Sequence, residues 1–193
     1  MSVVLLCAHL YYRALQTVPT LVRLWILECK DRKLSAAVTS YTSKYFSSVL
    51  TNVELERVTR TPFGDEKMDV KVVPVHREVN LTYTVDENQI KINLKIPPDW
   101  PLHVIEVRGV KKVGVKEDRW QSWISGVRQV VLTQVGLTVT FPRIPQMSPN
   151  PQGSVVDGLE LFKKNVSAHF DNKTECAICY SYALSLPLCQ GCS

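Results

Sequence analysis

The first third of the chain has apolar residues at helical spacing. In residues 3–16, the apolar positions that share one helical face are Val4, Ala8, Tyr11, Tyr12 and Leu15. Pro19 suits the first turn of a second helix, because a proline at that position loses no N–H group that the helix needs. A third helix is indicated by apolar residues that recur every three or four positions: Leu34, Val38, Tyr41, Tyr45 and Val49. The pattern therefore predicts an all-α segment over residues 1–60.

The period of the pattern then changes from that of a helix to that of a strand. Residues 61–76 contain two prolines and one glycine in a charged stretch, and we expect a linker there. Apolar and polar residues then alternate over residues 79–85 and again over residues 90–96, with a polar turn between them. Alternation with a period of two predicts a β-hairpin that has one buried and one solvated face.

A third strand and two further helices complete the pattern. Prolines at positions 97, 98 and 101 demand a rigid turn before a strand near residues 102–108. Residues 117–134 carry a wide apolar stripe suited to covering a sheet, and Ser154 can cap a last helix. Between these helices, residues 135–153 contain four prolines and predict a loop. Strands grouped together, with helices packed on one side of them, indicate the α+β class.

Composition and charge narrow the environment of the chain. Of its 193 residues, 45% are hydrophobic and 21% are charged, and the net charge is +5. The mild positive charge permits an acidic partner, such as a ribosomal surface, but does not demand one. Because no apolar run approaches the roughly 18–20 residues that span a bilayer, we expect no membrane partner. DNA is not an expected partner either. The expected compartment is the cytoplasm, where C-x-x-C motifs are more readily metal sites than disulfides.

The strongest candidate for chemistry lies near the end of the chain. Four of the six cysteines form two C-x-x-C pairs, Cys176 with Cys179 and Cys189 with Cys192. Four thiolates can hold one structural zinc ion in a tetrahedron, although the spacing between the pairs is tight for a zinc ribbon. A redox dithiol and unpaired surface thiols are the alternatives, but a thioredoxin-like motif would need a βαβ setting.

Other candidate residues carry weaker signals. Cys7 and Cys29 fall within predicted helices, where we expect them to be buried small apolar residues. His169 is expected to be a surface histidine rather than a ligand. The sequence contains no phosphate-binding glycine loop and no G-x-S-x-G motif. Four lysines could form a basic patch, although a solvated face is the preferred explanation: Lys91, Lys95, Lys111 and Lys112.

Several stretches, in the same order, resemble the C-terminal end of the listerin family of ubiquitin-protein ligases. They include IPPDWPLHVIEV, VGVKEDRWQSWISGVRQVVL, GLELFKKNVSAHF and ECAIC, and the resemblance covers roughly residues 9–179. It implies that residues 1–60 are the end of an α-helical solenoid. It also implies that residues 77–173, with a proline-rich insert at 135–153, form an RWD domain with a three- to four-stranded antiparallel sheet. Residues 174–193 would be the start of a RING-type zinc segment.

The resemblance also implies a function. RWD domains are relatives of ubiquitin-conjugating enzymes that lack the catalytic cysteine, and this chain has no cysteine between Cys29 and Cys176. Listerin-type ligases ubiquitylate stalled nascent chains on the large (60S) ribosomal subunit. Their RING finger forms no covalent intermediate, and it orients the loaded ubiquitin-conjugating enzyme. Ile178 matches the apolar position that contacts this enzyme in RING fingers, although it could instead pack inside the zinc knuckle.

The chain departs from the family pattern in two places. The loop at 135–153 is longer than the turn we expect in the family. A RING finger holds two zinc ions in a cross-brace with eight ligands, of which Cys176, Cys179, Cys189 and Cys192 would be the first four. The chain stops at Ser193, so we expect a truncated form with reduced or no ligase activity. Either the four thiols share one zinc ion or the segment stays unfolded. The alternatives are a non-catalytic ribosome-docking module and a zinc-binding adaptor.

Overall fold

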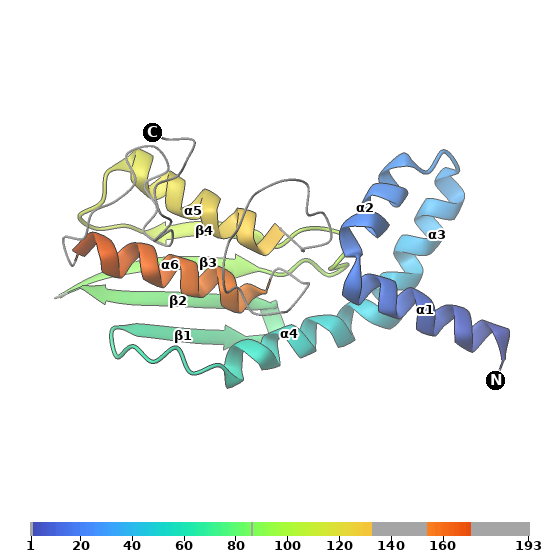
Figure 1. The fold of residues 1–193 in the computed structure, drawn as a ribbon, viewed down its shortest axis with the longest axis horizontal. Coiled ribbons are helices and arrows are strands. Elements are labelled where there is room, and N and C mark those ends of the chain that lie inside the picture. The colour runs from blue at the N-terminus through green and yellow to red at the C-terminus, as the bar shows by residue number, and fades with distance from the viewer. Residues whose placement is uncertain (1, 86, 133–153, 171–193) are drawn as a thin grey trace, which may run out of the picture.

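The structure joins a helical region to a four-stranded sheet that carries two further helices (Figure 1). It is a computed structural model that describes residues 2–85, 87–132 and 154–170. The four strands follow one another in both sequence and space, in the order β1-β2-β3-β4, and each pairs antiparallel with the next. The predicted α+β class is confirmed.

The helical region contains four α-helices and one π-helical turn. They are α1 (Val3–Thr17), α2 (Pro19–Glu28), α3 (Arg32–Thr42), η1 (Ser43–Ser47) and α4 (Ser48–Arg60). Pro19 occupies the first turn of α2, as predicted. Asp31 caps α3, because its Oδ1 accepts hydrogen bonds from the backbone N–H groups of Lys33 at 2.9 Å and Leu34 at 3.1 Å. Of the apolar face predicted for α1, only Leu15 is buried, and Val4 is 72% exposed.

The sheet consists of β1 (Met68–Val73), β2 (Glu78–Val85), β3 (Asn88–Lys95) and β4 (Glu106–Lys111). A short 3₁₀ turn, η2 (Pro74–His76), joins the first two strands. The predicted hairpin is confirmed as the β2–β3 pair, in which Leu81 lies opposite Ile92. In these strands the inward side chains are buried and the outward ones are at least partly exposed.

One prediction about the strands is wrong, and the bounds of another need correction. The expected linker at residues 61–76 contains β1, whose alternation of Met68, Val70 and Val72 with charged residues is short and lies close to prolines. The strand expected near residues 102–108 begins only at Glu106, because residues 97–102 form turns. In these turns the N–H groups of Trp100 and Leu102 donate to backbone carbonyls three residues earlier. The Trp100–Pro101 peptide bond is cis.

The core lies between the sheet and the helices α5 (Glu117–Leu132) and α6 (Val155–Phe170), which cover one face of it (Figure 1). Trp123 and Phe162 are fully enclosed and meet edge to face, with ring centroids 6.2 Å apart. Trp120 lies directly against β4 at Gly109, where an added Cβ would come within 2.5 Å of the indole ring. Helix α5 can pack this closely against β4 because residue 109 is a glycine.

The two regions share one buried cluster. Leu15 of α1 and the residues Leu50, Leu55 and Val58 of α4 belong to the same apolar core as the sheet. Arg23 of α2 also reaches the turn before β4, where its Nη1 donates a hydrogen bond to the carbonyl of Pro101 at 3.0 Å. In the part of the chain that is described, no helix is long and apolar enough to cross a membrane.

Candidate functional site

The predicted zinc ligands lie outside the described residues. These are Cys176, Cys179, Cys189 and Cys192, and the predicted enzyme contact Ile178 and the insert 135–153 also lie outside them. Within residues 2–85, 87–132 and 154–170, no group of three or more His, Cys, Asp or Glu side chains could hold a metal ion. The zinc site and the contact at Ile178 therefore stay predictions.

The expectation for the two remaining cysteines is wrong. Cys7 is exposed and Cys29 is partly exposed, and both are free thiols. They fall within or next to helices that bury little of their own surface, because α1 buries only Leu15 and α2 only Pro19. Helical spacing alone could not show which face of these helices would be covered.

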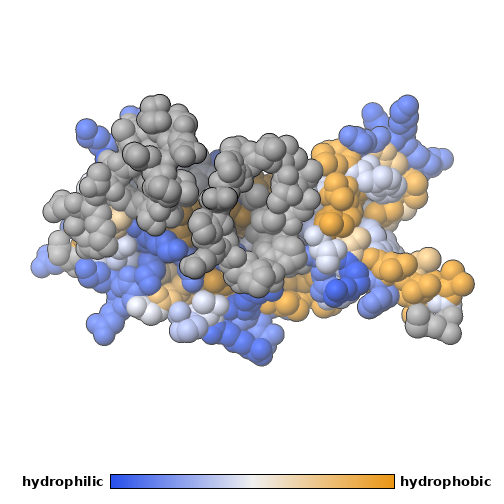
Figure 2. Space-filling model, in the orientation of Figure 1, coloured by the Kyte–Doolittle hydropathy of each residue, from blue (hydrophilic) through white to orange (hydrophobic). Residues whose placement is uncertain are grey.

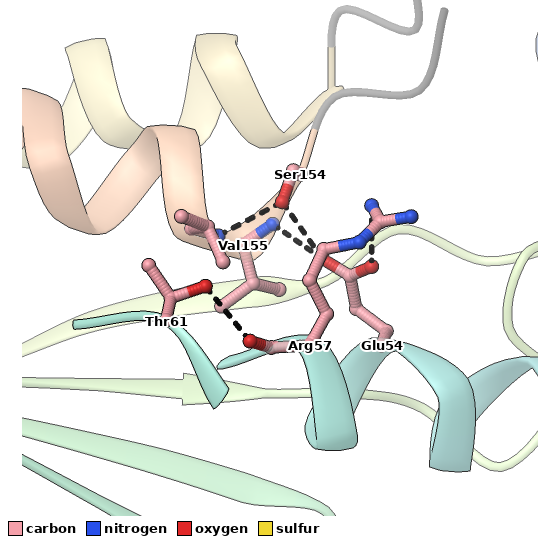
Figure 3. Close-up of polar contacts among 6 residues, drawn as sticks. Glu54, Arg57, Thr61, Ser154 and Val155 are labelled. Atoms are coloured by element: carbon pink, nitrogen blue, oxygen red, sulfur yellow. Dashed lines mark hydrogen bonds and ion pairs between the residues drawn. The ribbon is translucent and has the colours of Figure 1, made fainter. Parts of the chain in front are cut away.

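A buried carboxylate joins the helical region to the last helix of the sheet region (Figure 3). Glu54 lies on α4 and is only 4% exposed. Its Oε1 accepts a hydrogen bond from the backbone N–H of Val155 at 2.7 Å and another from the hydroxyl of Ser154 at 3.2 Å. Because Val155 begins α6, the carboxylate satisfies one of the N–H groups that a helix N-terminus leaves unpaired. It also places a negative charge at the positive end of the helix dipole.

The electrostatics of this junction are dominated by burial. Loss of water raises the pKa of Glu54 above its ordinary value. The hydrogen bonds from Val155 and Ser154 and the charge of Arg57 oppose this rise, whereas the charge of Asp157 adds to it. Arg57 pairs with the other carboxylate oxygen at 3.2 Å. Sequence reasoning missed Glu54, although one signal was available: an acidic residue falls midway between Leu50 and Val58, four residues from each, on the buried face of α4.

The opposite end of α6 is fixed by a second set of contacts. Arg119 of α5 donates from Nη1 to His169 Nδ1 at 2.7 Å, and His169 Nε2 lies 3.4 Å from the carbonyl oxygen of Gly114. The imidazole ring also packs edge to face against Trp123, with centroids 5.5 Å apart. His169 is therefore a partly buried structural residue rather than the simple surface histidine predicted. Helix α6 is held at both ends, and the cysteine-containing segment follows it in the chain.

The outer face of the sheet carries a group of cations, which we call the cationic sheet face. It consists of three lysines, one each on β1, β3 and β4, arranged around three uncharged polar residues: Lys71, Lys91, Lys111, Asn80, Thr82 and Asn93. In the predicted lysine patch, Lys95 pairs with Glu78 at 3.6 Å and Lys112 pairs with Glu117. Lys91 and Lys111 lie opposite each other in the register. Neither lysine forms an ion pair with another described residue. Only Lys91 and Lys111 of the predicted patch belong to the cationic sheet face, which also includes Lys71, a residue that the sequence pattern did not single out.

A groove lies beside the cationic sheet face, where the chain turns between β3 and β4. Its walls carry both signs of charge and several apolar side chains: Lys95, Pro97, Pro98, Asp99, His103, Val104, Glu106 and Arg108. The ring nitrogen Nδ1 of His103 lies 2.5 Å from Asp99 Oδ2, and Arg108 pairs with Glu106 at 2.5 Å. Because Lys95 and Arg108 already pair with Glu78 and Glu106, the groove has less free positive charge to offer a partner than the cationic sheet face.

Comparison with known proteins gives the same order of parts. Residues 1–59 match a family model described as the LTN1 family HEAT repeat region, and residues 68–140 match one described as ubiquitin conjugating domain-like. The chain is 33% identical to the E3 ubiquitin-protein ligase listerin of Schizosaccharomyces pombe over 91% of its own length. It is 32% identical to the listerin of Gallus gallus over 97% of its length. In both comparisons the chain spans only 10% of the relative.

Proposed function

We propose that this chain, which belongs to the listerin family of E3 ubiquitin-protein ligases and corresponds to its C-terminal region, acts in ubiquitylation on the ribosome. Its targets would be nascent chains stalled on the large ribosomal subunit, in the cytoplasm. The single observation that supports this proposal best is the order of the parts along the chain. A HEAT-type helical end, a ubiquitin conjugating-like domain and two C-x-x-C pairs follow one another within 193 residues.

The four terminal cysteines would supply the metal site of the ligase. Thiolates in two C-x-x-C pairs are the donor set that structural zinc prefers, so Cys176, Cys179, Cys189 and Cys192 fit this metal. Zinc would supply only shape, because a RING-type ligase transfers ubiquitin by orienting the loaded conjugating enzyme. In this proposal Ile178, between the first two ligands, contacts that enzyme.

The described part of the chain would act as the support for this segment. Orientation is effective only when the groups that position the reactants are themselves held firmly. Helix α6 is fixed at its start by Glu54 and at its end by Arg119 and Gly114 acting on His169. A conjugating enzyme bound after residue 170 would thus be placed relative to both the sheet and the helical region.

Zinc content and ubiquitin discharge test this proposal together. We expect the purified chain to hold zinc, and we expect replacement of Cys176 and Cys179 by serine to abolish both zinc binding and any discharge from a loaded conjugating enzyme. Ile178→Ala should reduce discharge while zinc stays bound. Val75→Ala is the matched control, because Val75 is an exposed aliphatic residue far from this segment in the sequence. A chain that carries no zinc would contradict the metal site, and with it the RING-type mechanism.

A second candidate function is ribosome docking without catalysis. The chain has no cysteine between Cys29 and Cys176, so the conjugating-like domain cannot itself carry ubiquitin as a thioester and would serve as a binding module under either candidate. Co-sedimentation with large ribosomal subunits distinguishes the two candidates. Salt-sensitive pelleting without discharge would favour the docking module, and pelleting with zinc-dependent discharge would favour the ligase.

A further inference from the structure

The two faces of the sheet differ sharply in what covers them. The inner face packs against α5 and α6, and its side chains on β2 and β3 are almost completely buried. On the outer face, every described side chain is partly or fully exposed, including the cationic sheet face of Lys71, Lys91, Lys111, Asn80, Thr82 and Asn93.

The charges of the outer face do not cancel. The register places two acidic residues, Glu78 and Glu106, at one end of the strands. They are neutralised by Lys95 and Arg108. In the next two rows, the three lysines of the cationic sheet face have no ion pair among the described residues, and the only acidic residue in these rows is Asp69. A net positive charge therefore remains where the uncharged polar residues lie.

The register arranges these residues in two rows across the sheet. One row runs Lys71, Asn80, Asn93, Arg108, and the other runs Asp69, Thr82, Lys91, Lys111. Asn93 donates from Nδ2 to Asn80 Oδ1 at 2.8 Å, which fixes both amides in the centre of the face. Because neighbouring strands lie about 4.8 Å apart, β1 and β4 are about 14 Å apart. Lys71 on β1 and Lys111 on β4 therefore lie on opposite sides of this centre, in different rows.

This arrangement suits the backbone of double-stranded RNA. A-form RNA presents a wide, shallow minor groove with 2′-hydroxyl groups between two lines of phosphates, and proteins read it through hydroxyl and phosphate contacts. Amide and hydroxyl side chains in the centre match the 2′-hydroxyls, and the flanking lysines match the phosphates. The face lacks the aromatic side chains on which single-stranded bases stack and the buried apolar anchors that dominate protein–protein interfaces.

We propose that the cationic sheet face docks the chain on the backbone of duplex RNA, without reading base sequence. The inference rests on the proposed function, because ribosomal RNA is the duplex RNA that a chain acting on the large subunit would meet. It adds to that function the surface of contact and the chemistry of the partner.

The inference can be tested by measuring binding of the chain to a short RNA duplex. Fluorescence anisotropy at several salt concentrations gives the affinity and its salt dependence. The full chain should bind, and replacement of Lys71, Lys91 and Lys111 by glutamine should weaken binding at least about tenfold and reduce the salt slope by about three. Replacement of the same three lysines by arginine should restore most of the affinity, because the positive charge returns.

A matched control separates local contact from total charge. Glutamine at Lys30, Lys33 and Lys44 removes three positive charges from exposed positions in the helical region and should leave the affinity for duplex RNA within about twofold of the unmodified chain. Equal weakening by both triple variants would overturn the proposal. Competition by polyglutamate as strong as that by RNA at equal charge would also overturn it and would indicate an acidic protein partner.

Pelleting with large ribosomal subunits distinguishes this inference from the function on which it rests. A chain that pellets with subunits equally well with and without the three lysines overturns the cationic sheet face as the docking surface and leaves the proposed function standing. A chain that binds duplex RNA through these lysines but does not pellet with subunits supports the surface and contradicts the ribosomal function.

Discussion

The helical region and the sheet region bury their apolar residues to very different degrees. In the sheet region, Trp123 is 1% exposed and the inward residues of β2 and β3 are almost inaccessible. In the helical region, Trp25 is 45% exposed and Leu27 is 80% exposed, and Figure 2 shows hydrophobic residues gathered over these helices. The comparison shows that amphipathic spacing predicts a helix but not what covers it. HEAT-type helices share their core with neighbouring repeats, whereas a sheet with two helices encloses its own.

The largest expected effect is a loss of stability when tryptophan is replaced by alanine in the sheet region. The same replacement in the helical region should cost much less. Trp123→Ala removes a side chain that packs against Trp120, Phe162 and His169, and should lower the free energy of unfolding by about 3–5 kcal/mol. Trp25→Ala removes a half-exposed side chain and should cost about 1 kcal/mol or less. Urea unfolding of both variants measures the difference. Equal losses would mean that the helical region is as well packed as the sheet region, which would remove the contrast.

The next effect concerns the junction between the two regions. Glu54→Ala leaves the Val155 N–H and the Ser154 hydroxyl without their acceptor, at a cost of about 1–3 kcal/mol for each buried donor. Hydrogen exchange at the first turn of α6 should accelerate in this variant.

Glu56→Ala is the matched control for the junction. Glu56 lies on the same helix but is exposed, and its pairing with Arg60 at 2.5 Å should contribute less than about 1 kcal/mol. If the two alanine variants lose the same stability, the buried carboxylate does not hold the two regions together.

Alanine substitutions at two glycines test how tightly the sheet region is packed. A Cβ at Gly158 would lie 2.8 Å from Val131 Cγ2 and 3.3 Å from Val127 Cγ1, so Gly158→Ala should cost about 1–3 kcal/mol by overpacking the α5–α6 interface. A Cβ at Gly126 would meet Leu161 Cδ2 at 3.6 Å, which is an ordinary contact. Gly126→Ala should therefore raise the thermal midpoint, because alanine favours a helix by up to about 1 kcal/mol. A stabilising Gly158→Ala would show that this interface has spare room.

The smallest effect is a pH dependence of the junction. Burial raises the pKa of Glu54 in the folded chain above its ordinary value of 4.5, so the folded state binds this proton more tightly than the unfolded state. The stability that this proton contributes is fully present below pH 4.5, and it is lost as the pH rises through the raised pKa.

Glu54→Gln should remove this pH dependence. Glutamine keeps a carbonyl oxygen for the two donors but carries no charge, so the free energy of unfolding should vary less with pH in this range than in the unmodified chain. Glu56→Gln should leave the dependence in place. If Glu54→Gln leaves the slope unchanged, another group titrates there.

Local patterns predicted much of the fold, and long-range contacts decided the rest. The β2–β3 hairpin and the helices α5 and α6 were predictable because each has an uninterrupted period, whereas the six residues of β1 were too few to stand out between prolines. The exposure of Cys7 could not be predicted, because burial depends on which neighbours cover a helix. Glu54 was missed because its partners lie about a hundred residues further along the chain. The roles of Cys176 and Ile178 remain predictions.

The long sequence separation between Glu54 and Val155 affects the order in which the chain folds during synthesis. The four strands form a simple meander in which each pairs with the next as soon as both exist, so the sheet can assemble step by step during synthesis. Glu54 and Val155 are separated by 101 positions, and the carboxylate therefore stays in water until the last described helix has been made. The polar link between α4 and the start of α6 is then a late event. A chain stopped before Val155 would lack this link, although α4 and the turn before β4 already join the two regions.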